Sequence, residues 1–485
     1  MNGTPAGEPS AVTWLARLRA GELSARELAE RTLARLDAAA ALNAVVERRD
    51  DAVLAAADAA DARRRRGEER PLLGLPLTVK DVLDVAGWRT AAGSLARADH
   101  RADADATVVA RLRGAGAIVV ARTNVPECSC SFETDNLIAG CTRHPLDPER
   151  TSGGSSGGEA ALLGADASIA GVGTDGGGSI RAPSHFCGTV GIRPTVGRTP
   201  ETGIWPPTRA TGMMDLTCVG PMARHVEDLP LLLAVMAGAD GVDPYAVDQP
   251  LGDWRGHEPA SWRVAFYDDH PRVPSTTPGT RAAVRAAAAA LEAAGARVEE
   301  IAPPDAGVGD IAGRSSTELF FAASGADGGA HLRRAVAAAG GRHHPQFAAL
   351  LGDGRGPEPS ADAFFETQRQ VFAYRAEVRR ALAAYDVVLS PVVAGPAPRH
   401  GEPPAGLPSE DYLRYEAFEY CHVNAVAGLP AAVVPAGVED DLPVGVQIAA
   451  APYREDLALA AARALEQALG GFAINRRLAH DRAAA

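Results

Sequence analysis

Apolar residues near the start of the chain recur three and four positions apart, which is the spacing of a helix with one buried face. Trp14 and Leu18 share such a face, and Gly21 follows where a helix would stop. Ser24 then opens a Ser-x-x-Glu capping box ahead of a second run of leucines at helical spacing. We therefore predict that residues 1–66 form helices that pack on the rest of the protein.

Further along the chain, helical spacing alternates with short unbroken apolar runs. Residues 107–113 have helical spacing and end at Gly114, and residues 117–120 form an apolar run typical of a strand covered on both faces. The same patterns predict strands at residues 264–267, 298–301, 387–389 and 431–434, and helices at residues 281–294 and 455–469. Helices that alternate with buried strands predict an α/β fold.

The pattern is less regular in one internal segment. Glycine, histidine and proline interrupt weak helical spacing between residues 305 and 359. We expect a peripheral helical region here, either a small subdomain or a lid, within residues 305–380. Because no internal repeat is found, we predict one domain over residues 1–485.

Composition narrows the class of protein. Hydrophobic residues make up 46% of the 485 positions and charged residues 22%, which is ordinary for a globular protein. The formal net charge is -13 and the single basic run lies at residues 63–66, so we expect no nucleic-acid surface. Six cysteines without disulfide spacing, residues 1–9 without a secretory pattern and the lack of a long apolar run predict a cytoplasmic protein with no membrane segment.

Lysine usage draws attention to one position. Of the 48 basic residues other than histidine, one is a lysine, Lys80. Arginine can replace the positive charge of a surface lysine, but it cannot supply a neutral amine. Lys80 ends the apolar, strand-like residues 74–80, which would carry its amine into the interior and lower its pKa. A general base is one interpretation, and a structural lysine paired with Asp81 or Asp84 is the other.

Two glycine-rich segments follow Lys80. Residues 151–159 hold four glycines and three serines, and an apolar helix-like run begins directly after them, which favours a tight loop over a flexible linker. The segment also matches the nucleophile-elbow pattern around Ser155, but no buried strand precedes it. Its most direct interpretation is a loop that presents hydroxyl groups.

The second segment covers residues 173–181. Successive glycines let backbone amides converge on one point, where they bind a developing oxyanion, and Ser179 comes directly after them as a candidate nucleophile. Gly171, Gly173 and Gly176 also match a dinucleotide fingerprint, but no amphipathic helix begins after them. We therefore favour nucleophilic catalysis by serine over nucleotide binding.

With Lys80 and these two segments in this order, the chain resembles the amidase signature family. The similarity also covers residues 74–81, 123–127, 220–224 and 424–447, and residues 240–380 lack it. The family fold is a large mixed β-sheet core flanked by helices, and that is the fold the resemblance implies.

The resemblance implies a Ser-cisSer-Lys triad. Ser179 would attack the substrate carbonyl, Ser155, preceded by a cis peptide bond from Gly154, would relay protons, and neutral Lys80 would be the base. The remaining roles it implies are an oxyanion hole of the amides of Gly176, Gly177, Gly178 and Ser179, and supporting contacts from Ser156, Asp175 and Arg181. The chain departs from the family at Gly176, where a larger residue such as isoleucine is usual, and this puts the shape of the substrate in doubt.

The family implies an amidohydrolase that needs no metal and no organic cofactor, acting on the amide, carbamate or ester of a small molecule. The alternative is the glutaminase-type component of a tRNA-dependent amidotransferase. We expect a monomer or homodimer with a neutral or aromatic acyl group in its pocket. Candidate pocket residues are Cys128, Ser131, Trp205, Met213, Met214, Tyr420 and His422. No zinc-type motif occurs, and Cys128 and Cys130 have the wrong spacing for one.

Overall fold

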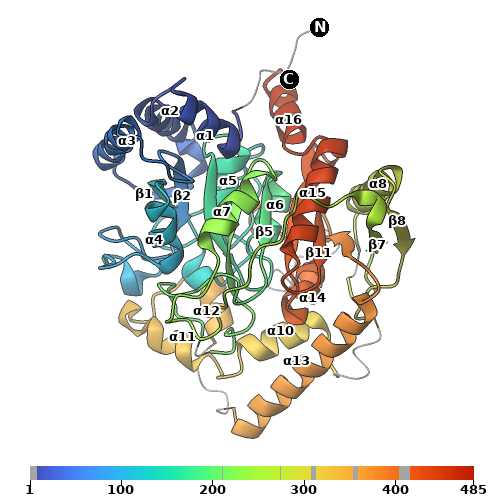
Figure 1. Cartoon of the computed structure of the whole chain (residues 1–485). Helices are drawn as coiled ribbons and strands as arrows, with labels where there is room; N and C mark the ends of the chain where they lie inside the picture. The colour runs from blue at the N-terminus through green and yellow to red at the C-terminus, as the bar shows by residue number, and fades with distance from the viewer. Residues whose placement is uncertain are drawn as a thin grey trace.

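A single mixed sheet runs through the protein (Figure 1). The computed structural model describes residues 8–209, 211–273, 275–306, 313–352, 359–403 and 416–484. Within these ranges, eleven strands form the sheet in the order β1-β3-β2-β4-β6-β5-β10-β11-β9-β7-β8. The strands are β1 Val45–Arg48, β2 Pro76–Lys80, β3 Ile118–Thr123, β4 Ala170–Asp175, β5 Val190–Arg193, β6 Cys218–Ala223, β7 Arg263–Phe266, β8 Arg297–Glu300, β9 Val387–Pro391, β10 Ala431–Glu439 and β11 Leu442–Ala450.

The sheet has two blocks of parallel strands with antiparallel pairs between them. β2 is parallel to both β3 and β4, and β7 is parallel to both β8 and β9. β4 with β6 and β10 with β11 are antiparallel. Every residue of β2, β3, β4 and β11 is buried, because helices cover both faces of the central sheet. The predicted α/β fold with a mixed sheet flanked by helices is confirmed.

Helices surround the sheet. α1, α2 and α3 come first in the chain, and the predicted stop at Gly21 and capping box at Ser24 are both present. α5 and α6 follow the two glycine-rich segments, and α8 and α15 pack on β10 and β11. The helices outside residues 313–382 are α1 Ala11–Ala20, α2 Ala25–Ala38, α3 Asp50–Arg65, α4 Thr107–Gly114, α5 Gly157–Gly164, α6 Arg181–Cys187, α7 Asp228–Met236, α8 Pro278–Ala293, α14 Glu419–Ala427, α15 Glu455–Leu469 and α16 Ala473–Ala484, with short 3-10 turns η1 Ala40–Leu42, η2 Leu95–Arg97, η3 Glu127–Ser129, η4 Pro259–Ser261 and η7 Glu416–Phe418.

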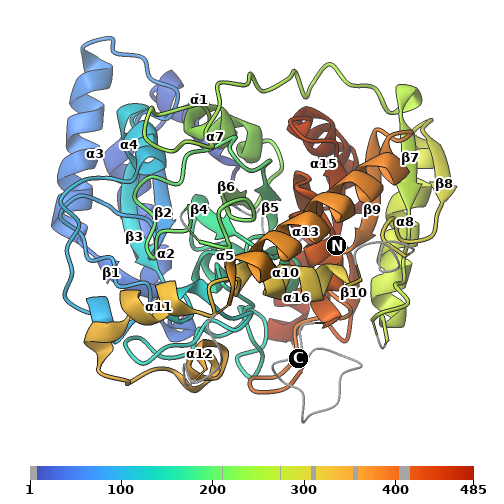
Figure 2. The same ribbon diagram turned by 90° about the horizontal axis from the view of Figure 1, so that it is seen from below.

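A group of helices lies across one end of the sheet (Figure 2). They are α10 Ser316–Ser324, α11 Ala330–Ala335, η5 Ala337–Ala339, α12 Pro345–Leu351 and α13 Ala361–Leu382. We call α10 to α12 with η5 the lid segment. The lid segment and most of α13 fall within residues 305–380, for which the sequence predicts a peripheral helical region.

The C-terminal helices include a stretch, Glu455–Ala483, that is long and apolar enough by length and composition to cross a membrane. Most of its apolar window is buried, and α15 packs on β10, β11 and α8. Its apolar residues therefore belong to the protein core. The core helix of a soluble protein passes the same test, so the stretch is weak evidence for a membrane segment.

Candidate active site

Lys80 is the last residue of β2, and its whole side chain is buried. Its Nζ lies 2.7 Å from Oγ of Ser155 and 2.8 Å from Oγ1 of Thr174. Because β2 is a central strand with parallel neighbours on both sides, the amine emerges inside the protein at the end of the sheet. The alternative of a lysine paired with Asp81 or Asp84 is wrong, because Asp81 contacts Arg122 and Asp84 contacts Arg97.

Burial changes the protonation of this amine. It lowers the pKa of Lys80 to about 7, although the nearby carboxylates of Asp175 and Glu159 oppose that effect. At neutral pH a substantial fraction of Lys80 is therefore an uncharged amine with a free lone pair. An amine of this kind can accept a proton from the hydroxyl of Ser155, which is within hydrogen-bonding distance.

Ser155 lies in the loop that ends where α5 begins, and the Gly154–Ser155 peptide bond is cis. The next residue ties this loop to two other parts of the site. Oγ of Ser156 donates to the carbonyl of Thr174, and the Ser156 N–H donates to the carbonyl of Ser179 at 3.1 Å. The structure thus joins the loop of Ser155, the end of β4 and the segment that carries Ser179.

The glycine-rich turn after β4 positions Ser179 directly before α6. Gly178 has φ 137°, a backbone conformation that glycine adopts readily. Its N–H donates to Oδ1 of Asp175 at 2.8 Å, so the structure differs here from the expected oxyanion hole. Among the described residues, the N–H groups of Gly176, Gly177 and Ser179 have no acceptor, and these three remain available for an oxyanion.

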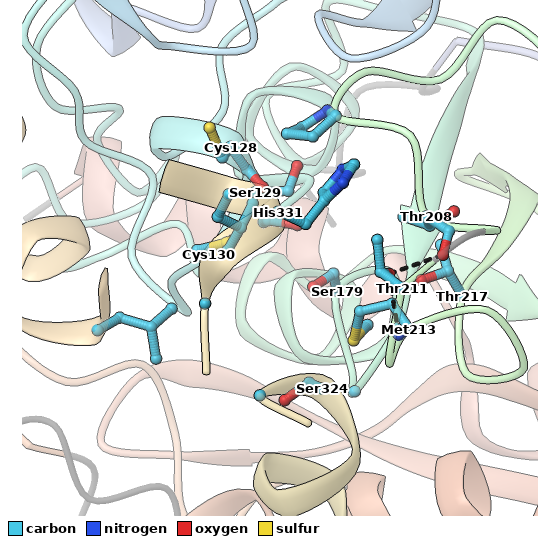
Figure 3. A pocket seen from close by; sticks show the side chains of 18 of the residues that line it. Cys128, Ser129, Cys130, Ser179, Thr208, Thr211, Met213, Thr217, Ser324 and His331 are labelled. Carbon is cyan, nitrogen blue, oxygen red and sulfur yellow. Dashed lines mark hydrogen bonds between the residues drawn. The ribbon is translucent and has the colours of Figure 1, made fainter. Parts of the chain in front are cut away.

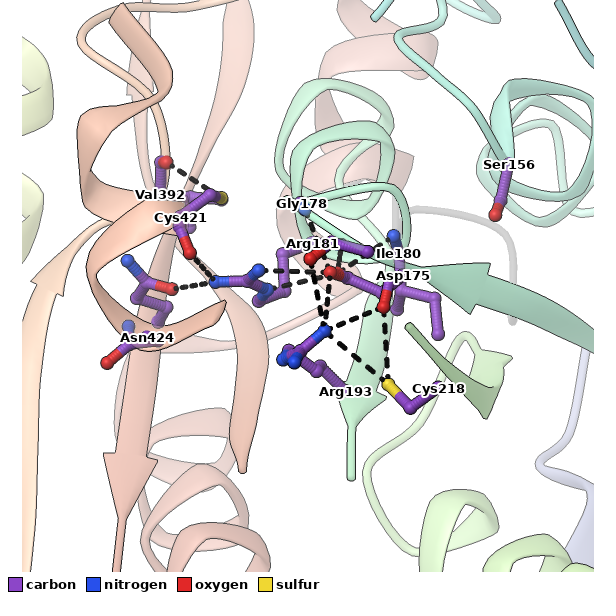
Figure 4. A network of polar contacts seen from close by, with 12 residues as sticks. Ser156, Asp175, Gly178, Ile180, Arg181, Arg193, Cys218, Val392, Cys421 and Asn424 are labelled. Carbon is purple, nitrogen blue, oxygen red and sulfur yellow. Dashed lines mark hydrogen bonds and ion pairs between the residues drawn. The ribbon is translucent and has the colours of Figure 1, made fainter. Parts of the chain in front are cut away.

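Asp175 holds this turn in place (Figure 4). Its carboxylate accepts from the N–H groups of Gly178 and Ile180 and from the guanidinium of Arg181, and Arg193 lies 3.3 Å away. Burial opposes the ionisation of Asp175, but the two guanidinium groups outweigh it and hold its pKa below the usual range. Asp175 is therefore a buried, paired anion at the base of the turn.

A cavity of about 420 Å³ opens above Ser155 and Ser179 (Figure 3). Its walls come from four parts of the chain: the loop after β3, the glycine-rich turn, residues 204–217 and the lid segment. The lining is mostly apolar, and aromatic side chains contribute from Phe132, Trp205, Phe320 and Phe321. No arginine is among the described residues that line it.

The seven predicted pocket residues divide into two groups. Cys128, Ser131, Trp205 and Met213 line the cavity. The remaining three do not line it, and for them the prediction is wrong. The Tyr420 hydroxyl bonds to Thr276, and its ring belongs to a separate apolar cluster. Nδ1 of His422 bonds to Thr317, and its ring stacks on Phe320. The carbonyl of Met214 accepts from Arg209.

The glycine at position 176 has a structural counterpart. A Cβ placed on Gly176 would lie 2.5 Å from Cε of Met213 and 3.5 Å from Oγ1 of Thr217. Met213 thus occupies the space that a side chain at position 176 would need. The side chain that is absent at position 176 is therefore replaced in space by Met213, which fills this part of the cavity wall.

Several lining residues were missed by sequence reasoning. Thr174 could have been found, because it is a polar residue near the end of an otherwise apolar run and precedes Asp175. The lid residues carry no comparable signal, since apolar side chains on weak helices resemble ordinary packing. The missed residues of the lid segment that line the cavity are Phe320, Phe321, Ser324, Gly325, Asp327, Gly328, Gly329, His331, Leu332, Leu350 and Leu351.

Two groups of side chains among the described residues could hold a metal ion: Glu133 with Cys141 and His400, and His270 with Asp305 and Glu419. In the first, Nδ1 of His400 contacts both the carboxylate and the thiol. In the second, Nε2 of His270 contacts Asp305. None of these six residues lines the cavity or contacts Lys80, so neither group enters the chemistry considered below.

Known proteins are similar to this chain over most of its length. The family described as Amidase matches residues 27–459. The chain is 33% identical over 475 residues to a component of the glutamyl-tRNA(Gln) amidotransferase of Roseiflexus sp. (strain RS-1), covering 91% of this chain and 92% of that one. It is 35% identical over 482 residues to the indoleacetamide hydrolase of Bradyrhizobium diazoefficiens, covering 97% of this chain and 88% of that one.

The fold is also similar to that of solved structures. A solved structure of 6-aminohexanoate cyclic dimer hydrolase superposes with a TM-score of 0.83 at 28% identity, covering 96% of this chain and 98% of that one. Because the family match spans most of the chain, this protein belongs to the amidase signature family.

Proposed function

We propose that this protein hydrolyses a carboxylic amide of a small molecule through an acyl-enzyme on Ser179. The observation that carries the proposal is the buried amine of Lys80 at 2.7 Å from Oγ of Ser155, beside a cavity that both Ser155 and Ser179 line. Burying a lysine and lowering its pKa costs free energy of folding, and groups perturbed in this way occur most often at sites with a chemical role. A proton relay from Ser179 through Ser155 to Lys80 gives it that role.

In the proposed reaction, the Ser179 proton passes to Ser155 while the Ser155 proton passes to Lys80, and Oγ of Ser179 bonds to the carbonyl carbon. The N–H groups of Gly176, Gly177 and Ser179 stabilise the oxyanion that forms. The carbon–nitrogen bond then breaks, and the amine leaves with a proton returned through Ser155. Water repeats the sequence on the acyl-enzyme, releasing the acid and restoring the Ser179 hydroxyl.

The cavity supports a neutral, partly aromatic substrate. Phe320, Phe321 and Trp205 offer flat apolar surface, and the described lining holds no arginine to pair with a carboxylate. Ser129, Thr217 and His331 each have a buried polar atom without a protein partner among the described residues, so a substrate that reaches them would supply one. The similarity to an indoleacetamide hydrolase points to arylacetamides as the first compounds to test.

The alternative is release of ammonia from glutamine as the glutaminase-type component of an amidotransferase. The similarity to a component of such an enzyme favours it. Glutamine carries an ammonium and a carboxylate next to each other, and binding it in a closed cavity requires a charged partner for each. Asp327 lines the cavity, but its carboxylate already accepts from the N–H groups of Gly329 and His331, and no arginine or lysine is among the described lining residues.

One assay separates the two functions. The purified chain is incubated with arylacetamides, anilides, carbamates, esters and glutamine, and the released amine or ammonia is measured. We expect turnover of neutral aromatic amides and none of glutamine. Ammonia from glutamine without turnover of any simple amide would contradict the proposal. Size-exclusion chromatography of the same sample tests our proposal of a monomer or homodimer that needs no partner protein.

A further inference from the structure

A buried carboxylate lies on the same side of the sheet as Lys80, and the proposed reaction gives it no role. Glu159, in the first turn of α5, is completely buried. Its Oε2 accepts from Oγ1 of Thr78 at 2.6 Å, and its Oε1 accepts from Oγ1 of Thr123 at 2.9 Å. Thr78 stands two residues before Lys80 on β2, and Thr123 is opposite Lys80 on β3. Side chains two apart on a strand share a face, so α5 meets this face with its carboxylate toward the lysine.

The place of this carboxylate is closely defined. Gly171 is the residue of β4 that pairs with Thr78 in the sheet. A Cβ on Gly171 would lie 2.0 Å from Oε2 of Glu159, so the carboxylate occupies the space that a side chain there would take. Two hydroxyl donors and one missing side chain therefore form a fitted site for Glu159.

No arginine or lysine side chain hydrogen-bonds to Glu159 in the described part of the chain; its two side-chain partners are the threonines. Burial raises the pKa of Glu159 to about 7, which the two threonines, Arg122 and Lys80 partly oppose. Other charged or titratable groups around the pair are Asp175 on β4 with its partners Arg181 and Arg193, Arg122 on β3 with its partner Asp81, and Cys130 in the loop after β3. Most of these are ion-paired among themselves, whereas Glu159 is not.

We propose that Glu159 is a positioning residue of the reaction, whose carboxylate adds to that of Asp175 the negative charge that lets Lys80 accept the serine proton. The inference rests on the proposed role of Lys80. Without the charge of Glu159, Asp175 would be the remaining carboxylate that opposes the effect of burial, and the amine would shift further toward its neutral form and become a weaker base. With it, Lys80 titrates near neutral pH, where a general base is most effective.

The test measures how the rate of Ser179 labelling by a fluorophosphonate depends on pH, which requires no knowledge of the substrate. In this reaction Oγ of Ser179 bonds to phosphorus, fluoride leaves with the phosphorus–fluorine bond pair, and the serine proton passes to Lys80. We expect Glu159→Gln to move the acidic limb of this profile to lower pH by about one unit, because a buried unit charge is lost. We expect the plateau rate to fall several-fold, because the base is weaker.

Two further variants make the result decisive. Glu466→Gln removes another buried carboxylate, on α15, which bonds to Val226 and Arg463 and lies outside the cavity; it should leave the limb in place. Gly171→Ala keeps the charge of Glu159 but displaces the carboxylate, and should shift the limb in the same direction as Glu159→Gln.

A lower plateau with an unmoved limb in Glu159→Gln would overturn the inference, since that is the result of a merely structural role. If Glu159→Gln does not fold, Gly171→Ala decides in the same way. Failure of the unmodified protein to label at Ser179 would instead overturn the proposed function, so the two failures are distinguishable.

Discussion

Two regions of the protein meet at the cavity and differ in how they hold their side chains. At the end of the sheet, Lys80, Ser155 and Asp175 are buried, and each has hydrogen-bond partners of its own. In the lid segment, Phe320 and Leu332 reach the same cavity through apolar packing on weak helices, and both are only partly buried. Hydrogen bonds therefore define the positions of individual polar atoms at the end of the sheet, whereas the lid segment contributes apolar surface to the cavity.

The two regions are nonetheless joined by several polar contacts, and those of Glu127 are among them. Glu127 lies in the loop after β3, and its carboxylate accepts from the N–H of His344 at 2.8 Å and contacts Nδ1 of His343 at 2.9 Å. Both histidines belong to the lid segment and directly precede α12. This difference indicates that the reaction can be preserved while the surface of the lid segment varies, provided that contacts such as those of Glu127 hold the two regions together. Changes at the sheet end should abolish the reaction, and changes in the lid should alter which substrates react.

The largest effect is expected at Lys80. Lys80→Arg keeps the charge but removes the neutral amine, so we expect kcat/KM to fall by at least about 1,000-fold. Ser179 labelling by a fluorophosphonate should slow by a similar factor. Substantial activity in Lys80→Arg would contradict a neutral base. Ser155→Ala is the matched control, because it breaks the same relay at its middle and should give a loss of similar size.

Removing the buried amine of Lys80 should lower activity but raise the stability of the folded protein. Because the folded-state pKa of Lys80 is lowered, the unfolded chain binds more protons between about pH 7 and the ordinary lysine pKa, and stability rises with pH across that window. Below about pH 7 the full penalty of burying the charge remains. We therefore expect Lys80→Met to raise the thermal midpoint at pH 6 and to raise it less at pH 9, measured by calorimetry.

An intermediate effect is expected at Gly176 and Met213, where the glycine-rich turn meets the wall formed by residues 204–217. Gly176→Ile should collide with Met213 and reduce kcat/KM for bulky aromatic amides by about 10- to 100-fold, while small amides are affected less. Met213→Ala added to Gly176→Ile should recover most of the loss, because it vacates the shared space. Equal losses in the single and double variants would contradict this explanation of the glycine.

The smallest effect is expected within the lid. Phe320 stacks on the ring of His422 with centroids 4.6 Å apart and lines the cavity. Phe320→Ala should raise KM for an aromatic amide by about 3- to 10-fold and leave kcat nearly unchanged, since it removes binding surface and not a reacting group. Phe365→Ala is the control, because that side chain is 58% exposed on α13 and should change neither constant. A fall in kcat with KM unchanged would contradict a role for Phe320 in binding alone.

The same division explains what the sequence could predict. Strands such as β3 and β9 were found because unbroken apolar runs mark strands buried on both faces. β6 was missed, because glycine and proline interrupt its apolar pattern at Gly220 and Pro221. Lys80, Ser155 and Ser179 were singled out because a lysine at the end of an apolar run and serines in two glycine-rich segments occur in the order typical of the amidase signature family.

The cavity walls were harder to predict, and α14 shows why. Tyr420 and His422 are two positions apart on this helix, and both are buried. The hydroxyl of Tyr420 bonds to Thr276, and the ring of His422 stacks on Phe320, so neither side chain lines the cavity. Which side of a fully buried helix meets a cavity depends on the segments packed around it, here Thr276 and α10, and local spacing carries no record of those partners.

The buried amine of Lys80 also has a practical consequence. Because the chain contains a single lysine, growth on lysine labelled with nitrogen-15 at the side chain would place one spectroscopic probe in the whole protein, at the proposed base itself. Its signal could be followed through a pH titration, through acylation of Ser179 and through substrate exchange without any assignment problem. The protonation state of this group could then be observed directly, rather than inferred from rates.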